Sequence, residues 1–419
     1  MQLIRPPFDD WYDNKGQLTD LIAPPIGLHL IAAAIEGAEV IDGLDGIVPD
    51  LHGDIVGVTE DYSRHLNALN LLREAKDNGA TTFLGGPNVT YLAKNILRNH
   101  PFVDYVVVGD GEEALPAFVN GVDRRNIPNL VYRDNGRIVA NARKNAPLIT
   151  LFDLDNYESG AIPLSMIRGC VKAESSGRCS FCSIDHSLKV MDPSLGWEQV
   201  KRLNEKHGAT YFWETGDSFI VGDFASRFLA LRPKSLSHVQ FRVYVRPDQL
   251  DSHNAQVLSA LNVKSLYIGI ESGSNSVLSS ANKGCSLSDI RNSLDLAEKY
   301  SLPIHVPFML GLPGTTYESL ESDYRLAEEI SSRFPEMMMI VSLPVLFPGT
   351  QLFNNVRDNY SSEYPGDLYN DDFFDYRKLF ELNVKHFTSV DMSAIDDVYD
   401  RMRGLVKKDG NFTSFALNR

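Results

Sequence analysis

Residues 168–182 read RGCVKAESSGRCSFC and contain three of the four cysteines in this chain of 419 residues. Eight residues separate Cys170 from Cys179, and two separate Cys179 from Cys182. Such crowding is typical of a metal site in a reducing compartment rather than of a disulfide framework. Three nearby thiolates without a local fourth leave one iron of an iron–sulfur cluster open to a small molecule. The spacing favours zinc equally, because His186 completes a set of three cysteines and one histidine.

The segment before the cysteines alternates short apolar runs with helix-like stretches, as far as about Gly121. This rhythm predicts an α/β domain with a small doubly wound, Rossmann-like parallel sheet, whose ligands sit outside the carboxyl ends of the strands. The predicted strands are Gln2–Arg5, Ala38–Ile41, Asp54–Thr59, Thr81–Leu84 and Asp104–Val108, and the predicted helices are Gly27–Glu36, His65–Asn78 and Thr90–Asn99.

A second alternating series begins near the cysteines and predicts an open, partial (β/α)6 TIM-like barrel. Its predicted strands are Leu164–Arg168, Thr210–Trp213, Gln240–Val245, Ser265–Ile270, Ile304–Leu310 and Met337–Leu343. A helix is expected over Leu287–Tyr300, because Ser286 and Asp289 form an N-cap signature.

The predicted domains are therefore a Rossmann-like domain over 1–125, a linker over 126–157, the partial barrel over 158–349 and a small, mostly helical C-terminal region over 350–419. The linker is expected to contain a hairpin at Asp134-Asn135-Gly136, which is a strong turn signal. The C-terminal region includes an acidic, aromatic-rich segment over Tyr369–Phe374 and helices near Tyr376–Val384 and Met392–Lys407.

Composition and charge exclude two classes of partner. A net charge of −15 would repel a phosphate backbone, so nucleic acid is not expected as a substrate. The most apolar stretch, Met337–Phe347, is too short to cross a bilayer, and the first residues show no secretory signal. We therefore expect a cytoplasmic protein without a membrane partner.

Over Gln2–Thr350 the chain resembles the radical S-adenosylmethionine (radical SAM) superfamily, in the branch with an N-terminal cobalamin-binding domain. Arg168-Gly169-Cys170 and Cys179-Ser180-Phe181-Cys182 look like its cluster loop. That loop commonly has three residues between the first two cysteines, so 171–178 contain an insertion of five. The resemblance implies that Cys170, Cys179 and Cys182 hold a [4Fe-4S] cluster, which decides against zinc.

Further matches follow at the carboxyl ends of the barrel strands. Tyr267–Gly273 (YIGIESG) is similar to the family's fourth-strand motif, Pro307–Gly314 (PFMLGLPG) to the fifth and Pro344–Gly349 to the sixth. The resemblance implies contacts with S-adenosyl-L-methionine from Glu214, Arg246, Gly269, Glu271, Ser272, Leu310, Gly311 and Leu346. No catalytic side chain is assigned from the sequence.

The first domain resembles the branch's cobalamin-binding domain, with glycines that let a corrin nucleotide tail lie against the backbone. The implied cobalamin contacts are Thr59, Gly85, Gly86, Thr90, Gly109, Gly111 and Glu112. The signature Asp-x-His-x-x-Gly, which supplies a histidine to cobalt, is absent. His65 lies four residues after Asp61, so we interpret it as a helix-surface histidine rather than a metal ligand. Base-off cobalamin without a protein imidazole is expected, and a domain that has lost cobalamin is the alternative.

The leading hypothesis is a cobalamin-dependent methyltransferase that acts on an unactivated carbon of a small metabolite or peptide by means of a 5'-deoxyadenosyl radical. The resemblance also implies reduced flavodoxin or ferredoxin as electron donor. The alternatives are a non-methylating radical cyclisation, rearrangement or oxidation, with or without cobalamin, and a zinc-stabilised binding protein without catalytic activity.

Overall fold

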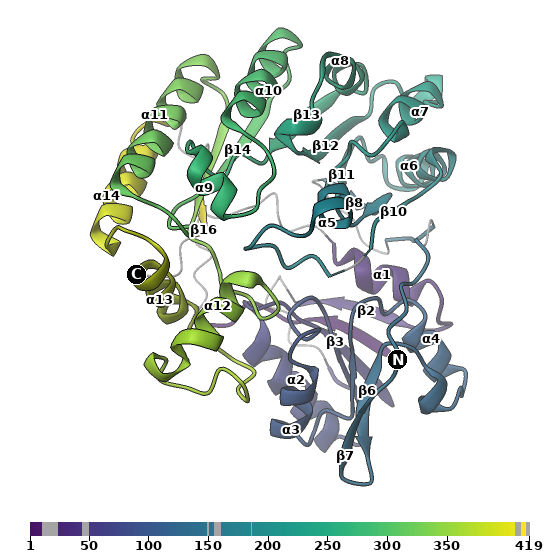
Figure 1. The fold of residues 1–419 in the computed structure, drawn as a ribbon. Coiled ribbons are helices and arrows are strands. Elements are labelled where there is room, and N and C mark those ends of the chain that lie inside the picture. The colour runs from purple at the N-terminus through teal and green to yellow at the C-terminus, as the bar shows by residue number, and fades with distance from the viewer. Residues whose placement is uncertain are drawn as a thin grey trace. The chain divides into compact units, whose positions relative to one another are not determined.

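The computed structural model describes residues 1–10, 24–43, 50–148, 151–154, 161–185, 187–406 and 412–415. Contacts divide these residues into two compact units (Figure 1). Of the described residues, those up to 154 and those of 365–374 form the first unit, and the others, from residue 161 on, form the second. Residues 365–374 come from the predicted C-terminal region, yet they pack with the first unit.

The first unit is built on a sheet with the order β2-β1-β3-β4-β5-β6-β7. Strands β1 to β5 are parallel, in the flavodoxin-like order of doubly wound folds. The predicted hairpin is present, and its strands β6 and β7 extend the sheet in antiparallel fashion. The strands are β1 (Gln2–Arg5), β2 (Glu39–Asp42), β3 (Ile55–Thr59), β4 (Thr81–Gly85), β5 (Tyr105–Val107), β6 (Leu130–Asp134) and β7 (Arg137–Ala140).

Helices cover this sheet, and apolar side chains fill the space between the layers. The helices are α1 (Ile26–Ala32), α2 (His65–Asp77), α3 (Ala93–Asn99), α4 (Ala114–Val119) and the 3-10 turn η3 (Arg124–Asn126). Leu3, Phe83 and Leu115 are buried in one core cluster. The sequence pattern therefore predicts strands β1 to β5 and helices α1 to α3, and most of their ends lie within a few residues of the predicted ones. Helix α4 is not among the predicted elements, and the hairpin, expected in a linker, extends the sheet instead.

The second unit contains a parallel sheet with the order β16-β15-β14-β13-β12-β11-β8, so neighbours in the sheet follow one another along the chain. This is the topology of a partial barrel, as the sequence predicts. A further strand, β16, pairs with β15 and was not predicted. The strands are β8 (Ile162–Leu164), β11 (Tyr211–Glu214), β12 (Gln240–Val245), β13 (Val263–Ile268), β14 (Ile304–Met309), β15 (Met338–Ser342) and β16 (Phe412–Phe415).

The first predicted barrel strand, Leu164–Arg168, is wrong as a single element. The chain leaves the sheet after β8, and a separate strand β9 (Ile167–Arg168) pairs antiparallel with β10 (Lys189–Val190). The physical reason is a buried carboxylate: the backbone N–H groups of Met166 and Ile167 donate to Glu214 instead of to a neighbouring strand. The β9–β10 ribbon brackets the cysteine loop.

Helices cover one face of the second sheet (Figure 1). Trp197 on α6 and Phe228 on α7 stack together and pack against Phe241 on β12. The predicted capping box of Ser286 and Asp289 begins α10. The helices are α5 (Val171–Ser176), α6 (Pro193–His207), α7 (Phe224–Ala230), α8 (Ser252–Ala260), α9 (Asn275–Ser280), α10 (Leu287–Lys299), α11 (Tyr317–Arg333), α12 (Gln351–Tyr360), α13 (Tyr376–Phe387) and α14 (Met392–Arg403), with 3-10 turns η4 (Lys234–Leu236), η5 (Pro247–Gln249) and η6 (Ser361–Glu363).

In the described part of the chain, every helix is too short or too polar to cross a membrane.

Candidate functional site

The three clustered cysteines lie on one loop of the second unit, between β9 and β10. Cys170 is the residue before α5, and Cys179 and Cys182 follow that helix. The inserted residues thus form a short helix, which ends at Gly177 with a φ of +80°. The insertion lengthens the connection between the first two cysteines and leaves all three half-buried.

Hydrogen bonds fasten this loop to the end of α9 and the start of α12. The N–H of Ser180 donates to the carbonyl of Ala281 at 2.9 Å, and the carbonyl of Ser180 accepts from the N–H of Leu352 at 3.1 Å. The side-chain amide of Asn282 also donates to the carbonyl of Arg178. The regions that follow β13 and β15 therefore hold the cysteine loop in place.

Positive charges surround the thiols. Burial raises the pKa of Cys182 to about 11. Burial also raises the pKa of Cys179, although Lys283, Lys172 and Arg246 oppose that rise through their positive charges. An iron–sulfur cluster takes its cysteines as thiolates, and a [4Fe-4S] core with three thiolates is negatively charged overall, so half-buried cysteines with Lys283, Lys172 and Arg246 nearby fit such a cluster.

The alternative of a single zinc ion is less well matched by the geometry. Ligands of one zinc ion lie close together, since each is about 2.0 to 2.3 Å from the metal. Among the described residues, the group of ligand atoms that lies within 4.8 Å is His65, His100 and Asp372, and the loop cysteines form no such group. His186, the predicted fourth zinc ligand, lies outside the described residues.

A buried ion pair lies beside the cysteines. The ammonium of Lys283 is 2.7 Å from the carboxylate of Glu271, and both side chains are at most 10% exposed. Glu271 has a φ of +65°, an uncommon conformation for a residue with a side chain. A Cβ on Gly269 would stand 2.8 Å from the Lys283 ammonium, so a larger residue there would displace that side chain from the pair. The carbonyl of Lys283 in turn accepts from Arg246 at 2.9 Å.

This ion pair unites three of the residues predicted to contact S-adenosylmethionine: Gly269, Glu271 and Arg246. Burial alone would lower the pKa of Lys283, but the carboxylate of Glu271 outweighs burial and raises that pKa. The ammonium of Lys283 therefore stays charged at neutral pH. Lys283, which was not among the predicted contact residues, organises this part of the site, because its ammonium pairs with Glu271 and its carbonyl accepts from Arg246.

Glu214, another predicted S-adenosylmethionine contact, is bound to backbone N–H groups of the protein itself. Its side chain is fully buried, and it accepts from the N–H groups of Met166, Ile167 and Gly216. Burial raises the pKa of Glu214 to about 8 against these three hydrogen bonds. The carboxylate shapes the backbone in front of the cysteine loop, and its predicted contact with S-adenosylmethionine stays a prediction.

The remaining predicted S-adenosylmethionine contacts lie at the ends of β13, β14 and β15. The hydroxyl of Ser272 donates to Asp323 on α11 at 2.6 Å. Gly311 has a φ of +86° and packs against Phe380, while its carbonyl accepts from Asn383 at 2.8 Å. Leu310 and Leu346 are fully buried. The structure thus gives each of these residues a packing role, and any ligand contact would come from the backbone beside them.

In the first unit, the predicted cobalamin contacts gather at the carboxyl ends of β3, β4 and β5. Thr59 pairs with Gly85, and the N–H of Gly109 donates to the hydroxyl of Thr90 at 3.0 Å. Gly86 has a φ of +115°, and a Cβ there would overlap the carbonyl of Glu60. By contrast, the nearest atom to a Cβ on Gly85 would be 4.0 Å away, which leaves open space above the strand.

Two predicted cobalamin contacts continue this edge after β5. A Cβ on Gly111 would come within 3.1 Å of Ile31 on α1, and Glu112 is 8% exposed. The backbone is therefore loosely covered at Gly85, at the end of β4, and closely packed at Gly111, after β5. Such an edge fits a bulky cofactor that lies against backbone, which is the place for ligands in doubly wound folds.

The interpretation of His65 as a helix-surface residue is wrong. His65 is 1% exposed, although it is the first residue of α2. Its Nδ1 lies 2.7 Å from a carboxylate oxygen of Glu60, and its Nε2 is buried without a hydrogen-bond partner. The sequence could not reveal this, because Asp372 and Phe373, which cover the ring, come from the far end of the chain.

A second feature missing from the sequence analysis lies on the sheet face opposite α6 and α7. Arg242 on β12 is 2% exposed and stacks between the rings of Trp213 and Tyr267. It donates to the hydroxyl of Tyr267 at 2.6 Å, and its Nε has no hydrogen-bond partner. Burial and the charge of Arg242 lower the pKa of His305 to about 4. The inner face of the barrel is therefore aromatic and cationic rather than aliphatic.

Sequence comparisons find two known domains in the chain. The sequence model of the radical SAM superfamily matches residues 164–327, and that of the B12 binding domain matches residues 19–119. An uncharacterized methyltransferase of Pyrococcus horikoshii is 24% identical over 94% of this chain and 92% of its own length. An anaerobic magnesium-protoporphyrin IX monomethyl ester cyclase of Cereibacter sphaeroides is 24% identical over 74% of this chain and 54% of its own length.

Solved structures share the fold over the whole chain. The radical S-adenosylmethionine methyltransferase TsrM from Kitasatospora setae, with cobalamin and a [4Fe-4S] cluster bound, matches with a TM-score of 0.73. That match covers 100% of this chain and 93% of TsrM at 15% identity. The cobalamin-dependent S-adenosylmethionine radical enzyme OxsB matches with a TM-score of 0.63, over 99% of this chain and 64% of OxsB.

Proposed function

Because this chain belongs to the radical SAM superfamily and carries a B12-binding domain ahead of its radical SAM domain, we propose that it is a cobalamin-dependent methyltransferase. The proposed substrate is a small metabolite or peptide with an unactivated carbon. The observation that carries the proposal is that one chain contains both a three-cysteine loop beside cationic side chains in its radical SAM domain and a glycine-lined strand edge in its B12-binding domain. The names of the Pyrococcus relative and of TsrM support methyl transfer in particular.

Different residues of the second unit would bind the cluster and S-adenosylmethionine. Cys170, Cys179 and Cys182 would hold the [4Fe-4S] cluster, and Lys172, Arg246 and Lys283 would offset its negative charge. When bound, the cluster and S-adenosylmethionine supply a 5'-deoxyadenosyl radical, and cobalamin supplies a methyl group. Glu271, fixed by Lys283, and the backbone at Gly269 and Gly311 would orient S-adenosylmethionine beside the open iron.

The residues of the first unit would bind cobalamin without a histidine ligand to cobalt. His65 contacts Glu60 through its Nδ1 and is buried, so it is not available to ligate the cobalt of a cofactor at the strand ends. Gly85 would offer open backbone to the corrin nucleotide tail, and Gly86 would hold the turn that exposes it. We therefore propose base-off cobalamin, with reduced flavodoxin or ferredoxin as electron donor.

The test is product analysis with reconstituted enzyme, reductant and S-adenosylmethionine, with and without cobalamin. Methyl transfer predicts S-adenosylhomocysteine that forms only when cobalamin is present, together with 5'-deoxyadenosine. Formation of 5'-deoxyadenosine alone, with cobalamin bound, would refute the methyl transfer part. The matched control is Cys285→Ser, because Cys285 is half-buried like the loop cysteines but lies outside the loop.

A non-methylating radical reaction is the second candidate function. The similarity to the Cereibacter cyclase, whose name describes a ring closure, favours it. The same two cofactor sites would then serve a reaction that leaves no methyl group in the product. Labelled S-adenosylmethionine distinguishes the two: a label in the product indicates methyl transfer, and its absence indicates the cyclase-like reaction.

A further inference from the structure

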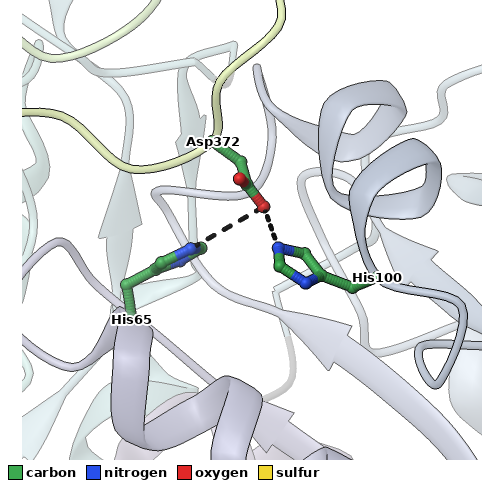
Figure 2. A group of neighbouring side chains, drawn as sticks. All are labelled: His65, His100 and Asp372. Carbon is green, nitrogen blue, oxygen red and sulfur yellow. Dashed lines mark hydrogen bonds and ion pairs between the residues drawn. The ribbon is translucent and has the colours of Figure 1, made fainter. Parts of the chain in front are cut away.

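Two histidines and a carboxylate, none of them assigned above to a cofactor, converge in the first unit (Figure 2). Asp372 Oδ2 lies 3.8 Å from His65 Nε2 and 2.6 Å from His100 Nε2. The three residues come from the start of α2, the end of α3 and the segment 365–374. Two imidazoles and one carboxylate are a frequent ligand set for zinc and other divalent transition metals.

The unsatisfied nitrogen of His65 is the observation that points to a ligand. His65 Nε2 is buried and has no hydrogen-bond partner, although buried polar atoms are nearly always paired. The other ring nitrogen, Nδ1, lies 2.7 Å from Glu60 Oε2, and Glu60 Oε1 accepts from Asn88 at 3.0 Å. With Nδ1 donating to Glu60, the lone pair of Nε2 faces Asp372. A carboxylate behind a histidine is the usual second shell of a metal-binding imidazole.

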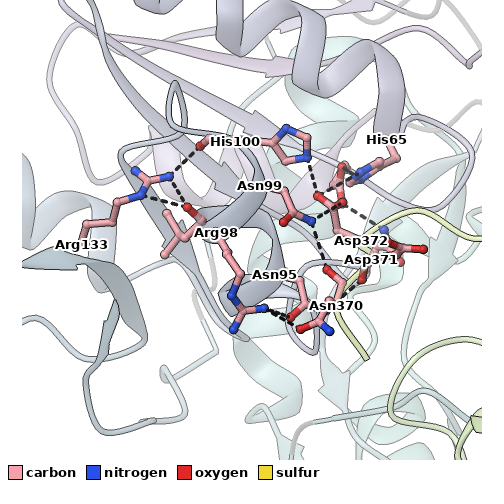
Figure 3. A network of polar contacts seen from close by, with 12 residues as sticks. His65, Asn95, Arg98, Asn99, His100, Arg133, Asn370, Asp371 and Asp372 are labelled. Carbon is pink, nitrogen blue, oxygen red and sulfur yellow. Dashed lines mark hydrogen bonds and ion pairs between the residues drawn. The ribbon is translucent and has the colours of Figure 1, made fainter. Parts of the chain in front are cut away.

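Asp372 is oriented in the same way. The side-chain amide of Asn99 donates to Asp372 Oδ1 at 3.2 Å, which leaves Oδ2 directed at the two histidines (Figure 3). Phe373 stacks on the ring of His65 with 5.8 Å between the ring centroids. The two buried ligands are therefore held in one orientation without an ion: Glu60 and Phe373 fix the ring of His65, and Asn99 fixes the carboxylate of Asp372.

The backbone on both sides of the site is also fixed. Asn95 donates to the carbonyls of Tyr369 and Asp371, at 3.0 and 2.9 Å, and so ties the segment 365–374 to α3 (Figure 3). Arg133 donates to the carbonyls of His100 and Val103, at 2.7 and 2.8 Å, and holds the end of α3. Such rigid supports are what a designed or natural metal site requires.

We propose that His65, His100 and Asp372 bind one divalent transition metal ion, of which Zn²⁺ is the representative. The ion would fasten segment 365–374 to the B12-binding fold. With metal–ligand distances of about 2.0 to 2.2 Å, tetrahedral ligands lie roughly 3.3 Å apart. The 3.8 Å separation of His65 and Asp372 is close to this value, and the hydrogen bond between His100 and Asp372 would lengthen as the ion enters. A water molecule would complete the coordination.

The role follows from burial. His65 is 1% exposed and Asp372 is 8% exposed, which leaves no room for a substrate at the ion. Glu60, behind His65, also forms the contact that requires glycine at position 86, so the ion would stabilise the turn beside the proposed cobalamin edge. The proposal stands independently of the proposed methyl transfer, because it concerns residues outside both cofactor sites.

The experiment is equilibrium dialysis of the fully reconstituted protein against Zn²⁺, followed by quantitation of zinc, iron and cobalt per chain. The iron–sulfur cluster then occupies the loop cysteines and removes them as zinc ligands. We expect about one zinc per wild-type chain. Asp372→Asn and His100→Gln are expected to lower zinc retention at least about tenfold with iron content unchanged.

Asp371→Asn is the matched control, because it removes the same charge from the neighbouring residue of the same segment. It should keep its zinc. X-ray absorption at the zinc edge should show nitrogen and oxygen neighbours without sulfur, and a chelator should lower the melting temperature of the wild type but not of Asp372→Asn. The proposal is overturned if the folded wild type binds no zinc, if both ligand variants bind as much zinc as the wild type, or if the zinc has sulfur neighbours. The three residues would then only form hydrogen bonds that hold segment 365–374 to the first unit.

Discussion

The two candidate cofactor regions bind by different means. The cysteine loop of the second unit relies on charged side chains, with Lys172, Arg246 and Lys283 around Cys179. The edge of the first unit relies on backbone, with Gly85 and Gly86 at the end of β4. A charged site depends on partners that stay ionised, whereas a backbone site depends on residues that lack a Cβ. The two regions should therefore fail in different ways when they are mutated.

The largest effect is expected at the cysteine loop. Cys179→Ser removes a thiolate, so we expect loss of bound iron and a fall of S-adenosylmethionine cleavage to the background level. Cobalt content should remain at the wild-type value, because the cobalamin edge involves no cysteine. Iron assay and product chromatography measure both. Cys285→Ser serves as control, and equal loss of iron in that variant would contradict a three-cysteine site.

A second large effect is expected at the glycine edge. Gly86→Ala must adopt a φ of +115° and overlap the Glu60 carbonyl, which should lower the free energy of unfolding by about 2 to 4 kcal/mol. Urea unfolding of the protein measures this change. Gly85→Ala should leave stability within about 0.5 kcal/mol, because its Cβ would meet open space.

Gly85→Ala also sharpens the comparison between the two regions. If the backbone at Gly85 contacts the corrin nucleotide tail, this variant should lose cobalamin affinity while folding normally and keeping its iron. Unchanged cobalamin affinity in Gly85→Ala would contradict the assignment of this edge.

A moderate effect is expected from the buried ion pair. Glu271→Gln leaves the ammonium of Lys283 buried without its carboxylate, which should cost about 3 kcal/mol of stability. The double variant Glu271→Gln with Lys283→Met should recover more than half of that loss, because no unpaired charge remains. Chemical denaturation of the wild type, Glu271→Gln, Lys283→Met and the double variant gives the coupling free energy between the two side chains. Independent, additive losses would show that the pair does not act as a unit.

The last prediction concerns the pH dependence of stability that Asp323, which accepts from Ser272, confers. Burial raises the pKa of Asp323 to about 7, so the folded chain binds more protons than the unfolded chain between about pH 4 and 7. Stability from this group is therefore full below pH 4 and is lost as the pH rises through 7, by at most about 1.4 kcal/mol per pH unit.

Asp323→Asn keeps the acceptor oxygen for Ser272 and removes the titration. The stability of this variant relative to the wild type should therefore rise with pH between about 4 and 7 and then level off. Denaturation curves at several pH values give the difference directly. A constant difference across this range would mean that Asp323 is not protonated in the folded state.

The sequence predicted the two sheets well because their strands carry local signals. Short Val- and Ile-rich runs between helical patterns located β1 and β12 to the residue. Locally encoded turns did the same for the hairpin at Asn135 and for the capping box at Ser286. The cysteine loop and the strand-end glycines were visible for the same reason, since they are contiguous motifs.

Features that depend on distant residues were not predictable. Strand β9 leaves the sheet because Glu214 captures the backbone N–H groups before it, and nothing in the local sequence signals that. His65 is buried because Asp372 and Phe373 pack over it from the other end of the chain. Lys283 and Arg242 acquire their roles only when neighbouring strands place their partners beside them.

The most direct test of the central claim is to reconstitute the chain anaerobically with iron, sulfide and hydroxocobalamin and to quantify iron, sulfide, zinc and cobalt after desalting. The account predicts about four irons and about one cobalt per chain, with sulfide matching iron. Iron without cobalt would contradict the cobalamin-dependent function and leave a radical enzyme without B12. Zinc in place of iron, without sulfide, would contradict the radical SAM function itself.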